Sequence, residues 1–203
     1  YALLQAANAA MRDAKHLPGT SVQWATEAGR HGLAAFFDAE QALRAGFEKD
    51  EFTLVYQPKV AAAGHHIVGF EALVRWDRPG IGRINPMDFI PAAERNGLIV
   101  PLGALILTQA CRQIARWRDQ GLALVPVAVN VSPLQLLDTQ FPNTVMKTLA
   151  QFQLPAHWLT LEITETAAVA HMDQAREQIS QLRQQGVDVA LDDFGTGFSS
   201  LNM

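Results

Sequence analysis

The sequence contains a single cysteine, Cys111, among its 203 residues. One thiol cannot close a disulfide within the chain, so a disulfide-stapled secreted domain is excluded and a reducing compartment is expected. Cys111 falls in an apolar helical pattern and is expected to be a small buried hydrophobic group. No run approaches about 18 apolar residues, and the first residues lack the layout of a signal peptide. We therefore expect a cytoplasmic segment without membrane contact, although a longer parent protein could carry a membrane anchor.

Positive charge is also scarce, because 16 lysines and arginines stand against 20 acidic residues and leave a net charge of −4. No basic stripe is available to displace counterions from a phosphate backbone, so binding along a nucleic-acid polymer is excluded. A small anionic ligand stays possible where metal ions offset the charge. Hydrophobic residues make up 49% of the chain, which is enough for a substantial core.

Three parts of the chain differ in pattern. Residues 1–19 space their apolar side chains as a helix does, and residues 20–37 predict a linker. Residues 38–203 form the main domain, which opens with a predicted helix over about 38–48.

Beyond this helix the pattern changes to strands. Residues 52–60 and 66–76 flank a turn at Ala63, Gly64 and His65, which predicts an antiparallel hairpin. Helices and near-continuous apolar strands then alternate, which predicts an α/β domain whose parallel sheet is covered by helices. The expected helices span residues 86–95, 101–120, 141–152 and 171–185, and the expected strands span 124–131, 158–164 and 187–192.

Four of the strand-like segments end in side chains that can bind a metal ion. These are Glu71, Asn130, Glu162 and the pair Asp192 and Asp193. In a barrel of parallel strands, side chains at the strand C-termini converge on one mouth, and an oxygen-rich cluster there suits a hard divalent cation. Any one of the acids could instead cap a following helix. Two adjacent carboxylates after an apolar strand are nevertheless costly unless a cation neutralises them.

Five short motifs occur along the chain in a fixed order. They are Tyr56-Gln57-Pro58, Glu71-Ala72-Leu73 followed by Arg75, Asn130-Val131-Ser132, Glu162-Ile163-Thr164-Glu165, and Asp192-Asp193-Phe194-Gly195-Thr196-Gly197. From about Phe52 to the last residue, this set resembles the EAL-domain phosphodiesterases that hydrolyse cyclic di-GMP. The resemblance implies a modified TIM (β/α)8 barrel with an antiparallel first strand, visible here through about strand five. Residues 1–19 are similar to the last helix of a GGDEF domain, which often precedes an EAL domain.

The resemblance also assigns roles to single residues. Glu71, Asn130, Glu162 and Asp192 would bind one Mg²⁺ or Mn²⁺, and Asp192 with Asp193 would reach a second ion. Gln57 and Leu73 would contact the nucleotide, and Arg75 would hold a phosphate oxygen unless it is a surface ion-pair partner. Glu165 would anchor the loop over residues 194–200 rather than bind metal.

The implied activity is hydrolysis of cyclic di-GMP to the linear dinucleotide pGpG by a water that two metal ions activate, in bacterial second-messenger signalling. A homodimer through this domain is expected. The alternative is a catalytically silent domain that binds cyclic di-GMP, and a third class is an unrelated TIM-barrel metal hydrolase. The enzyme is favoured because each acidic position of the visible motifs is occupied by Asp or Glu. A barrel of about 250 residues needs roughly three more βα units, so we expect the sequence to belong to a longer polypeptide.

Several conspicuous residues have simpler interpretations. His65 and His66 are expected in a solvated turn rather than at a metal. The run of residues 47–52 is expected to be a solvated helix end. Aromatic packing, rather than base stacking, is expected for Phe70, Trp76, Trp117 and Trp158.

Overall fold

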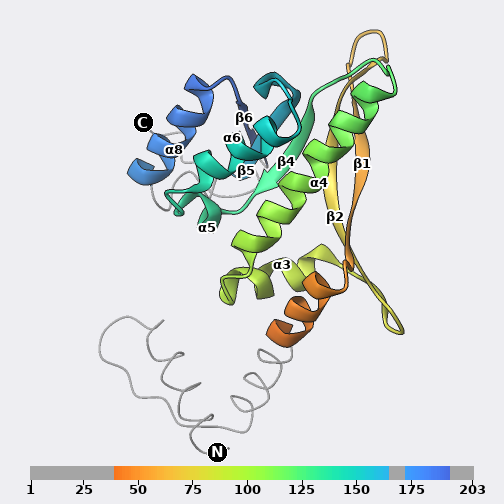
Figure 1. The fold of residues 1–203 in the computed structure, drawn as a ribbon, viewed down its shortest axis with the longest axis vertical. Coiled ribbons are helices and arrows are strands. Elements are labelled where there is room, and N and C mark those ends of the chain that lie inside the picture. Colours follow the sequence, from red (N-terminus) through yellow and green to blue (C-terminus); the bar gives the residue numbers. More distant parts are fainter. Residues whose placement is uncertain (1–38, 165–171, 193–203) are drawn as a thin grey trace, which may run out of the picture. The chain divides into compact units, whose positions relative to one another are not determined.

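The computed structural model describes residues 39–164 and 172–192 (Figure 1). The chain divides into two units, Tyr1–Lys49 and Asp50–Met203. In the first unit, residues 39–48 form the expected helix, along which Glu40 and Arg44 make an ion pair at 3.0 Å between Oε1 and Nη2. The predicted segments 1–19 and 20–37 lie outside the described residues.

A mixed sheet is the centre of the second unit (Figure 1). Its first two strands form the predicted antiparallel hairpin, and the later strands run parallel, so the predicted α/β class is confirmed. The strands follow the order β1-β2-β4-β5-β6, with β3 paired to β2 on one side. Their bounds are β1 Phe52–Val60, β2 Ile67–Arg78, β3 Gly82–Ile84, β4 Val127–Val131, β5 Leu159–Thr164 and β6 Asp188–Asp192.

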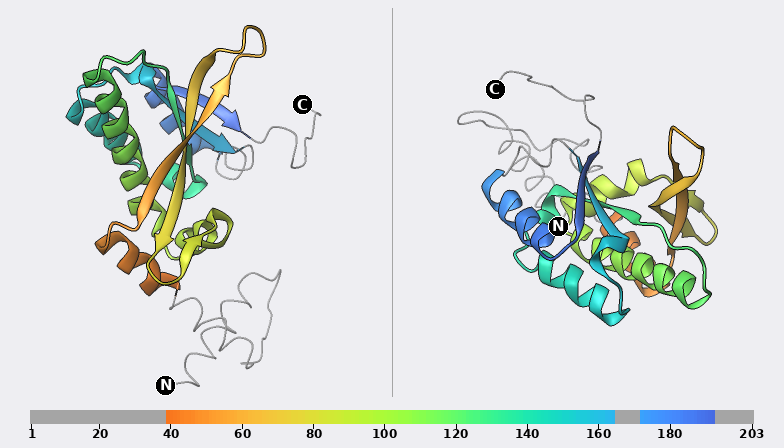
Figure 2. Two further views of the ribbon diagram at one scale, coloured as in Figure 1. Left: turned by 90° about the vertical axis from the view of Figure 1, so that its right-hand side faces the viewer. Right: turned by 90° about the horizontal axis from the view of Figure 1, so that it is seen from above.

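Helices alternate with the parallel strands, as the sequence predicted. The longest, α4, is followed along the chain by α6 and α8, and these three lie on the same face of the sheet (Figures 1 and 2). The helices are α3 Pro86–Arg95, α4 Ile99–Asp119, α5 Pro133–Leu136, α6 Phe141–Gln151 and α8 Met172–Gln184, with a 3-10 turn η1 at Ala156–Trp158. No helix within the described ranges has the length and apolarity needed to cross a bilayer.

Two strands differ from their predicted bounds for local reasons. The segment predicted over 124–131 becomes a strand only at Val127, because Pro126 has no backbone N–H to donate to a ladder. The Pro126 carbonyl still accepts a hydrogen bond from the Phe70 amide at 2.9 Å. Strand β2 continues to Arg78, beyond the predicted end at residue 76, because the unpredicted strand β3 pairs with it.

Alternation along the strands separates two faces of the sheet. The face that packs against the helices is apolar, and its side chains are buried. It includes Ala72, Val74, Trp76, Val127, Val129, Val131, Leu159, Leu161 and Ile163. The neighbouring positions therefore point to the opposite face, and these positions include Glu71, Asn130 and Glu162.

The long helix α4 buries one apolar face. Leu102, Ile106, Ala110 and Ile114 are all buried, and the single cysteine, Cys111, is buried beside them as predicted. Gly121 follows the helix end with φ +71, a left-handed conformation that glycine adopts without a steric penalty.

The run over residues 47–52 was wrongly predicted to be solvated throughout, because its last two residues are buried. Glu51 accepts a hydrogen bond from the Trp76 indole N–H at 2.9 Å and is 9% exposed. The Phe52 ring lies 5.2 Å from that of Trp76, and Phe89 lies 5.4 Å from Trp76, measured between ring centroids. Trp76 thus has the packing role that the sequence predicted, and its polar N–H is satisfied by a buried carboxylate.

Another close contact joins α4 to the short helix α5. Ser132 caps α5, and its backbone N–H donates to Gln135 Oε1 at 3.0 Å in a capping box. The Gln135 side chain is buried against Gly103 of α4, where a β-carbon would lie 1.9 Å from Gln135 Nε2. The absence of a side chain at Gly103 therefore leaves room for the glutamine that organises the chain after β4.

Gly103→Ala is expected to destabilise the fold by about 1–3 kcal/mol, because the new methyl group must displace Gln135 from its bond to Ser132. Alanine in a helix interior would otherwise stabilise by up to about 1 kcal/mol. Unfolding free energies from urea titrations would measure the difference. In a Gln135→Ala background the same substitution should become neutral or stabilising. Equal destabilisation in both backgrounds would contradict the contact.

We also expect Cys111 to resist alkylation in the folded chain, because burial raises the pKa of its thiol to about 12 and the thiolate is the reactive form. Mass spectrometry after iodoacetamide treatment, with and without guanidinium chloride, measures the protection. The raised pKa also means that stability from the neutral thiol is complete below its ordinary pKa of 9.0 and is lost as pH rises toward about 12. Equal labelling of folded and unfolded chains would refute the assignment.

Candidate functional site

Three of the predicted metal-binding residues lie on neighbouring parallel strands. Glu71 is on β2, Asn130 on β4 and Glu162 on β5. Glu71 is in register with Ala128, and Asn130 is in register with Glu162. All three positions belong to the sheet face opposite the helices. Glu71 lies in the middle of β2 (Ile67–Arg78) rather than at its predicted end, because the strand continues for seven residues beyond it.

The polar contacts join these residues in pairs. Asn130 Nδ2 donates to Glu71 Oε1 at 2.7 Å, across two adjacent strands. Lys59 Nζ, which comes from β1, donates to Glu162 Oε1. Glu162 is only 7% exposed, and its second oxygen, Oε2, is buried without a hydrogen-bond partner among the described residues.

The unpartnered oxygen of Glu162 tests whether this site fits a cation. A buried carboxylate oxygen that receives no hydrogen bond is costly, and a cation would remove that cost. Glu71 and Glu162 offer carboxylate oxygens, and Asn130 offers a neutral amide oxygen. Such an oxygen donor set suits Mg²⁺ or Mn²⁺ better than a soft metal. The residues present therefore fit a hard divalent ion.

The other acids of the predicted set are only partly within the described chain. Asp192 ends β6, where its backbone is in register with Thr164 of β5. Asp193 and Glu165, together with the predicted loop over 194–200, lie outside the described residues. Within residues 39–164 and 172–192, no three histidine, cysteine or acidic side chains come together as a metal cluster.

A cavity of about 380 Å³ opens beside Asn130. Two of the residues predicted to bind a ligand, Leu73 and Arg75, line it. Its other walls come mainly from α3, the start of α4 and α5, including Ile90, Glu94, Gly103, Ser132 and Gln135. Gln57, the third predicted contact, is not among the lining residues; it lies on β1 in register with Glu71.

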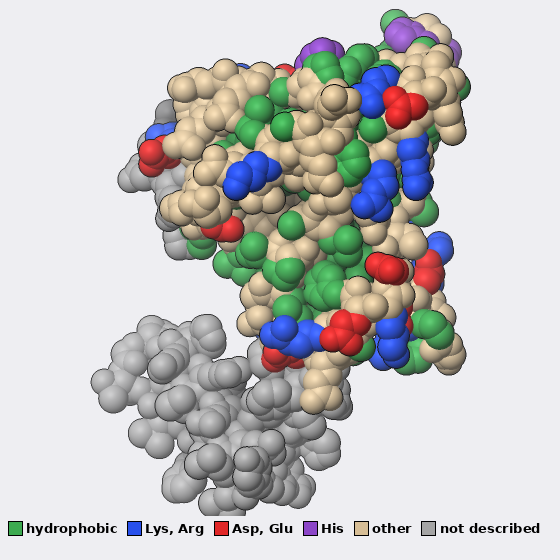
Figure 3. Space-filling model, viewed as in Figure 1, with side chains coloured by type: hydrophobic (Ala, Val, Ile, Leu, Met, Phe, Trp, Pro, Cys, Tyr) green, Lys and Arg blue, Asp and Glu red, His purple; other side chains and the backbone are tan. Residues whose placement is uncertain are grey.

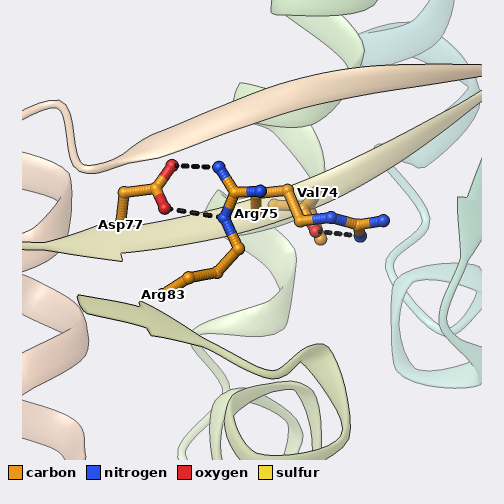
Figure 4. A network of polar contacts seen from close by, with 4 residues as sticks. All are labelled: Val74, Arg75, Asp77 and Arg83. Carbon is orange, nitrogen blue, oxygen red and sulfur yellow. Dashed lines mark hydrogen bonds and ion pairs between the residues drawn. The ribbon is translucent and has the colours of Figure 1, made fainter.

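Arg75 is next to a separate ion pair on the β2–β3 hairpin (Figure 4). Arg83 holds both oxygens of Asp77, at 2.7 Å from Nε and 3.1 Å from Nη2. The Arg83 hydrogen bond lowers the pKa of the Asp77 carboxyl below its usual range, with a smaller contribution from the charge of Arg75. Arg75 Nη1 donates to the Val74 carbonyl at 2.9 Å. Within the described part of the chain Arg75 makes no ion pair, so its guanidinium charge is not committed to Asp77.

Three residues of the site were missed by sequence reasoning. Lys59 could have been suspected, because it lies two residues after Gln57 on the same strand face. Glu94 on α3 accepts a hydrogen bond from Ser132 Oγ at 2.7 Å. Gln135 on α5 accepts one from the backbone N–H of the same serine at 3.0 Å. The spacing Ser132-Pro133-Leu134-Gln135 is a capping-box signature that could have identified Gln135. No spacing predicts the Glu94 contact, because it depends on how α3 docks.

The two histidines and the aromatic residues Phe70 and Trp117 behave as predicted. His65 and His66 are exposed at the β1–β2 turn, where Figure 3 shows histidine side chains at the hairpin tip. On the face drawn in Figure 3, lysine and arginine side chains are interspersed with acidic ones. Trp117 packs against Tyr56 and Phe70, at centroid distances of 5.1 and 5.4 Å.

Comparison with known proteins agrees with the fold. The EAL domain family matches residues 40–203. An uncharacterised protein of Mycobacterium tuberculosis is 42% identical over 180 residues, which are 88% of this chain and 58% of that protein. The bifunctional diguanylate cyclase/cyclic di-GMP phosphodiesterase MucR of Pseudomonas aeruginosa is 39% identical over 188 residues, 87% of this chain and 27% of MucR.

A solved structure described as the PaMucR phosphodiesterase in complex with c-di-GMP superposes with a TM-score of 0.75 at 41% identity. The match covers 80% of this chain and 66% of that one, so the chain spans only part of the length of these relatives. The mixed sheet with its antiparallel first strand corresponds to part of a modified TIM barrel. The chain therefore belongs to the EAL domain family.

Proposed function

We propose that this chain carries part of the active site of a phosphodiesterase that hydrolyses cyclic di-GMP to linear pGpG. The observation that carries the proposal is the group of Glu71, Asn130 and Glu162 on adjacent strands. One buried carboxylate oxygen of Glu162 has no hydrogen-bond partner in the described part of the chain. The relative MucR is named as a cyclic di-GMP phosphodiesterase, and the PaMucR structure is a c-di-GMP complex. Both names support the same ligand for this chain.

In this proposal Glu71, Asn130, Glu162 and Asp192 hold one divalent ion, and Asp192 with Asp193 holds a second. When bound, such ions activate a water for attack and offset negative charge on the phosphoryl group. Asn130 contributes a neutral oxygen, which avoids adding another negative charge beside two glutamates. Its amide N–H bond to Glu71 fixes the orientation of both side chains. Glu165 anchors the loop that follows the paired aspartates.

The cavity beside Asn130 is proposed to receive one half of the dinucleotide. Its volume of about 380 Å³ is near the lower end of about 300–1,000 Å³ for small-molecule pockets, which suits one nucleoside better than two. Leu73 offers an apolar contact. The Arg75 guanidinium, which donates to the Val74 carbonyl in this structure, can instead donate to a phosphate oxygen. Gln57, beside Glu71, is proposed to contact the nucleotide from β1.

Glu71→Ala is expected to weaken Mn²⁺ binding by at least about tenfold and to abolish turnover, because the site loses an oxygen ligand and Asn130 loses its hydrogen-bond partner. Isothermal titration of the full-length protein with Mn²⁺ measures the affinity. Glu177→Ala, which removes the same charge from an exposed position of α8, is the matched control. Unchanged Mn²⁺ affinity in Glu71→Ala would remove Glu71 from the site.

Asp193→Asn separates a hydrolase from a silent binding domain. The substitution keeps side-chain size and deletes a charge proposed to hold the second ion, so kcat should fall by about 100-fold or more while the Kd for cyclic di-GMP changes little. Binding and pGpG formation would be measured side by side with Mg²⁺ and Mn²⁺. Asp188→Asn, at the exposed beginning of β6, is the control.

The parent protein decides between the two functions in the same assay. If it binds cyclic di-GMP but forms no product with either metal ion, the hydrolase proposal fails and a binding domain replaces it. If Asp193→Asn loses binding and turnover equally, the second-ion role of Asp193 fails.

A further inference from the structure

The ion pair between Lys59 and Glu162 joins strands that are not neighbours in the sheet. Lys59 is on β1 and Glu162 on β5, with β2 and β4 between them. Three strand spacings of about 4.8 Å would separate β1 from β5 by about 14 Å in a flat sheet. The contact therefore requires the sheet to curve, and it places the lysine charge over the polar face that carries Glu71 and Asn130.

The two partners differ in their access to water. The Glu162 side chain is 8% exposed, whereas the Lys59 side chain is 39% exposed. The buried carboxylate depends on a positive partner, because an unpaired charge in a poorly hydrated place is costly. The lysine can withdraw to solvent at little cost, because its ammonium group is on a long flexible stem.

We propose that Lys59 is a built-in counter-charge that competes with the divalent ion for Glu162. The proposal rests on the proposed function only in taking Glu162 as a metal ligand. Lys59 satisfies one oxygen of the carboxylate and leaves the other unpaired, so it substitutes for a cation incompletely. A metal ion that binds Glu162 must displace the ammonium group or tolerate its repulsion, and either effect lowers metal affinity.

Lys59→Met removes the charge and keeps a long apolar stem. The Kd for Mn²⁺ should then decrease by about 3- to 30-fold. This is the range expected when the metal ion no longer has to break a partly exposed ion pair or tolerate repulsion by the lysine. Lys59→Arg, which keeps the charge, should remain within about twofold of wild type. Lys147→Met makes the same charge change at an exposed position of α6 and should also leave the Kd unchanged.

Thermal unfolding adds a readout that does not depend on activity. In EDTA, Lys59→Met should unfold at a lower temperature than wild type, because Glu162 loses its partner. Saturating Mn²⁺ should raise the Tm of Lys59→Met by more than it raises that of wild type. A purely structural role for the ion pair would lower the Tm equally with and without the metal ion.

Isothermal titration with Mn²⁺ of the full-length wild type and of Lys59→Met, Lys59→Arg and Lys147→Met tests whether Lys59 competes with the metal ion. If wild type binds Mn²⁺ and Lys59→Met binds with equal or weaker affinity, the competition is refuted while the metal site stands. If wild type does not bind and Lys59→Met does, the competition is supported. If neither chain binds Mn²⁺, the proposed metal site and the competition fall together.

Discussion

The strict alternation of side chains along the parallel strands is the constraint on which the site depends. Helices α4, α6 and α8 cover one face of the sheet, and that face is filled by aliphatic side chains such as Val129, Leu161 and Ile163. Every intervening side chain must point the other way. Because β2, β4 and β5 are adjacent and in register, Glu71, Asn130 and Glu162 are brought together by the same packing that buries the core.

Acidic side chains on one face of the sheet repel one another, and the structure neutralises them in two different ways. Near the β2–β3 hairpin, Asp77 is neutralised by a bidentate arginine, so Arg75 keeps its charge for another partner. On the polar face of the sheet, Glu162 is paired through one oxygen only, as far as the described residues go, and its partner is a lysine that is partly exposed to solvent. Both oxygens of Asp77 are therefore paired, whereas Glu162 has a second oxygen that a cation could bind.

Much of the fold could be predicted from the sequence, because strong periodicity decides the type of each element. Alternation predicted β1 with its observed bounds, Phe52–Val60, and the turn between the two strands predicted the antiparallel hairpin. Strand β3 and helix α5 were missed because each has only three or four residues, too few to show a period. The beginning of β4 was misplaced because apolar residues before Pro126 look like strand although proline ends the ladder.

The sequence predicted the proposed metal ligands of the site but not the residues that surround them. The prediction that strand ends carry the ligands led to Glu71, Asn130 and Glu162, although Glu71 lies in the middle of β2. The family resemblance led to Leu73 and Arg75, which line the cavity. Lys59 was missed because its contact with Glu162 depends on curvature of the sheet, which no local pattern encodes. Glu94 was missed because helix docking brings it to Ser132. Tertiary geometry, rather than sequence spacing, determines the contacts of Lys59 and Glu94. Gln135 was missed although its spacing from Ser132 is that of a capping box.

Anomalous diffraction from crystals of the full-length protein grown with Mn²⁺ is the most direct test of a shared metal site on the polar face of β2, β4 and β5. A manganese peak should lie within coordination distance of carboxylate oxygens of Glu71 and Glu162 and of the amide oxygen of Asn130, with Lys59 withdrawn from Glu162. A peak only at His65 and His66, or no peak near Glu71, Asn130 and Glu162 while the ion pair persists, would contradict the account.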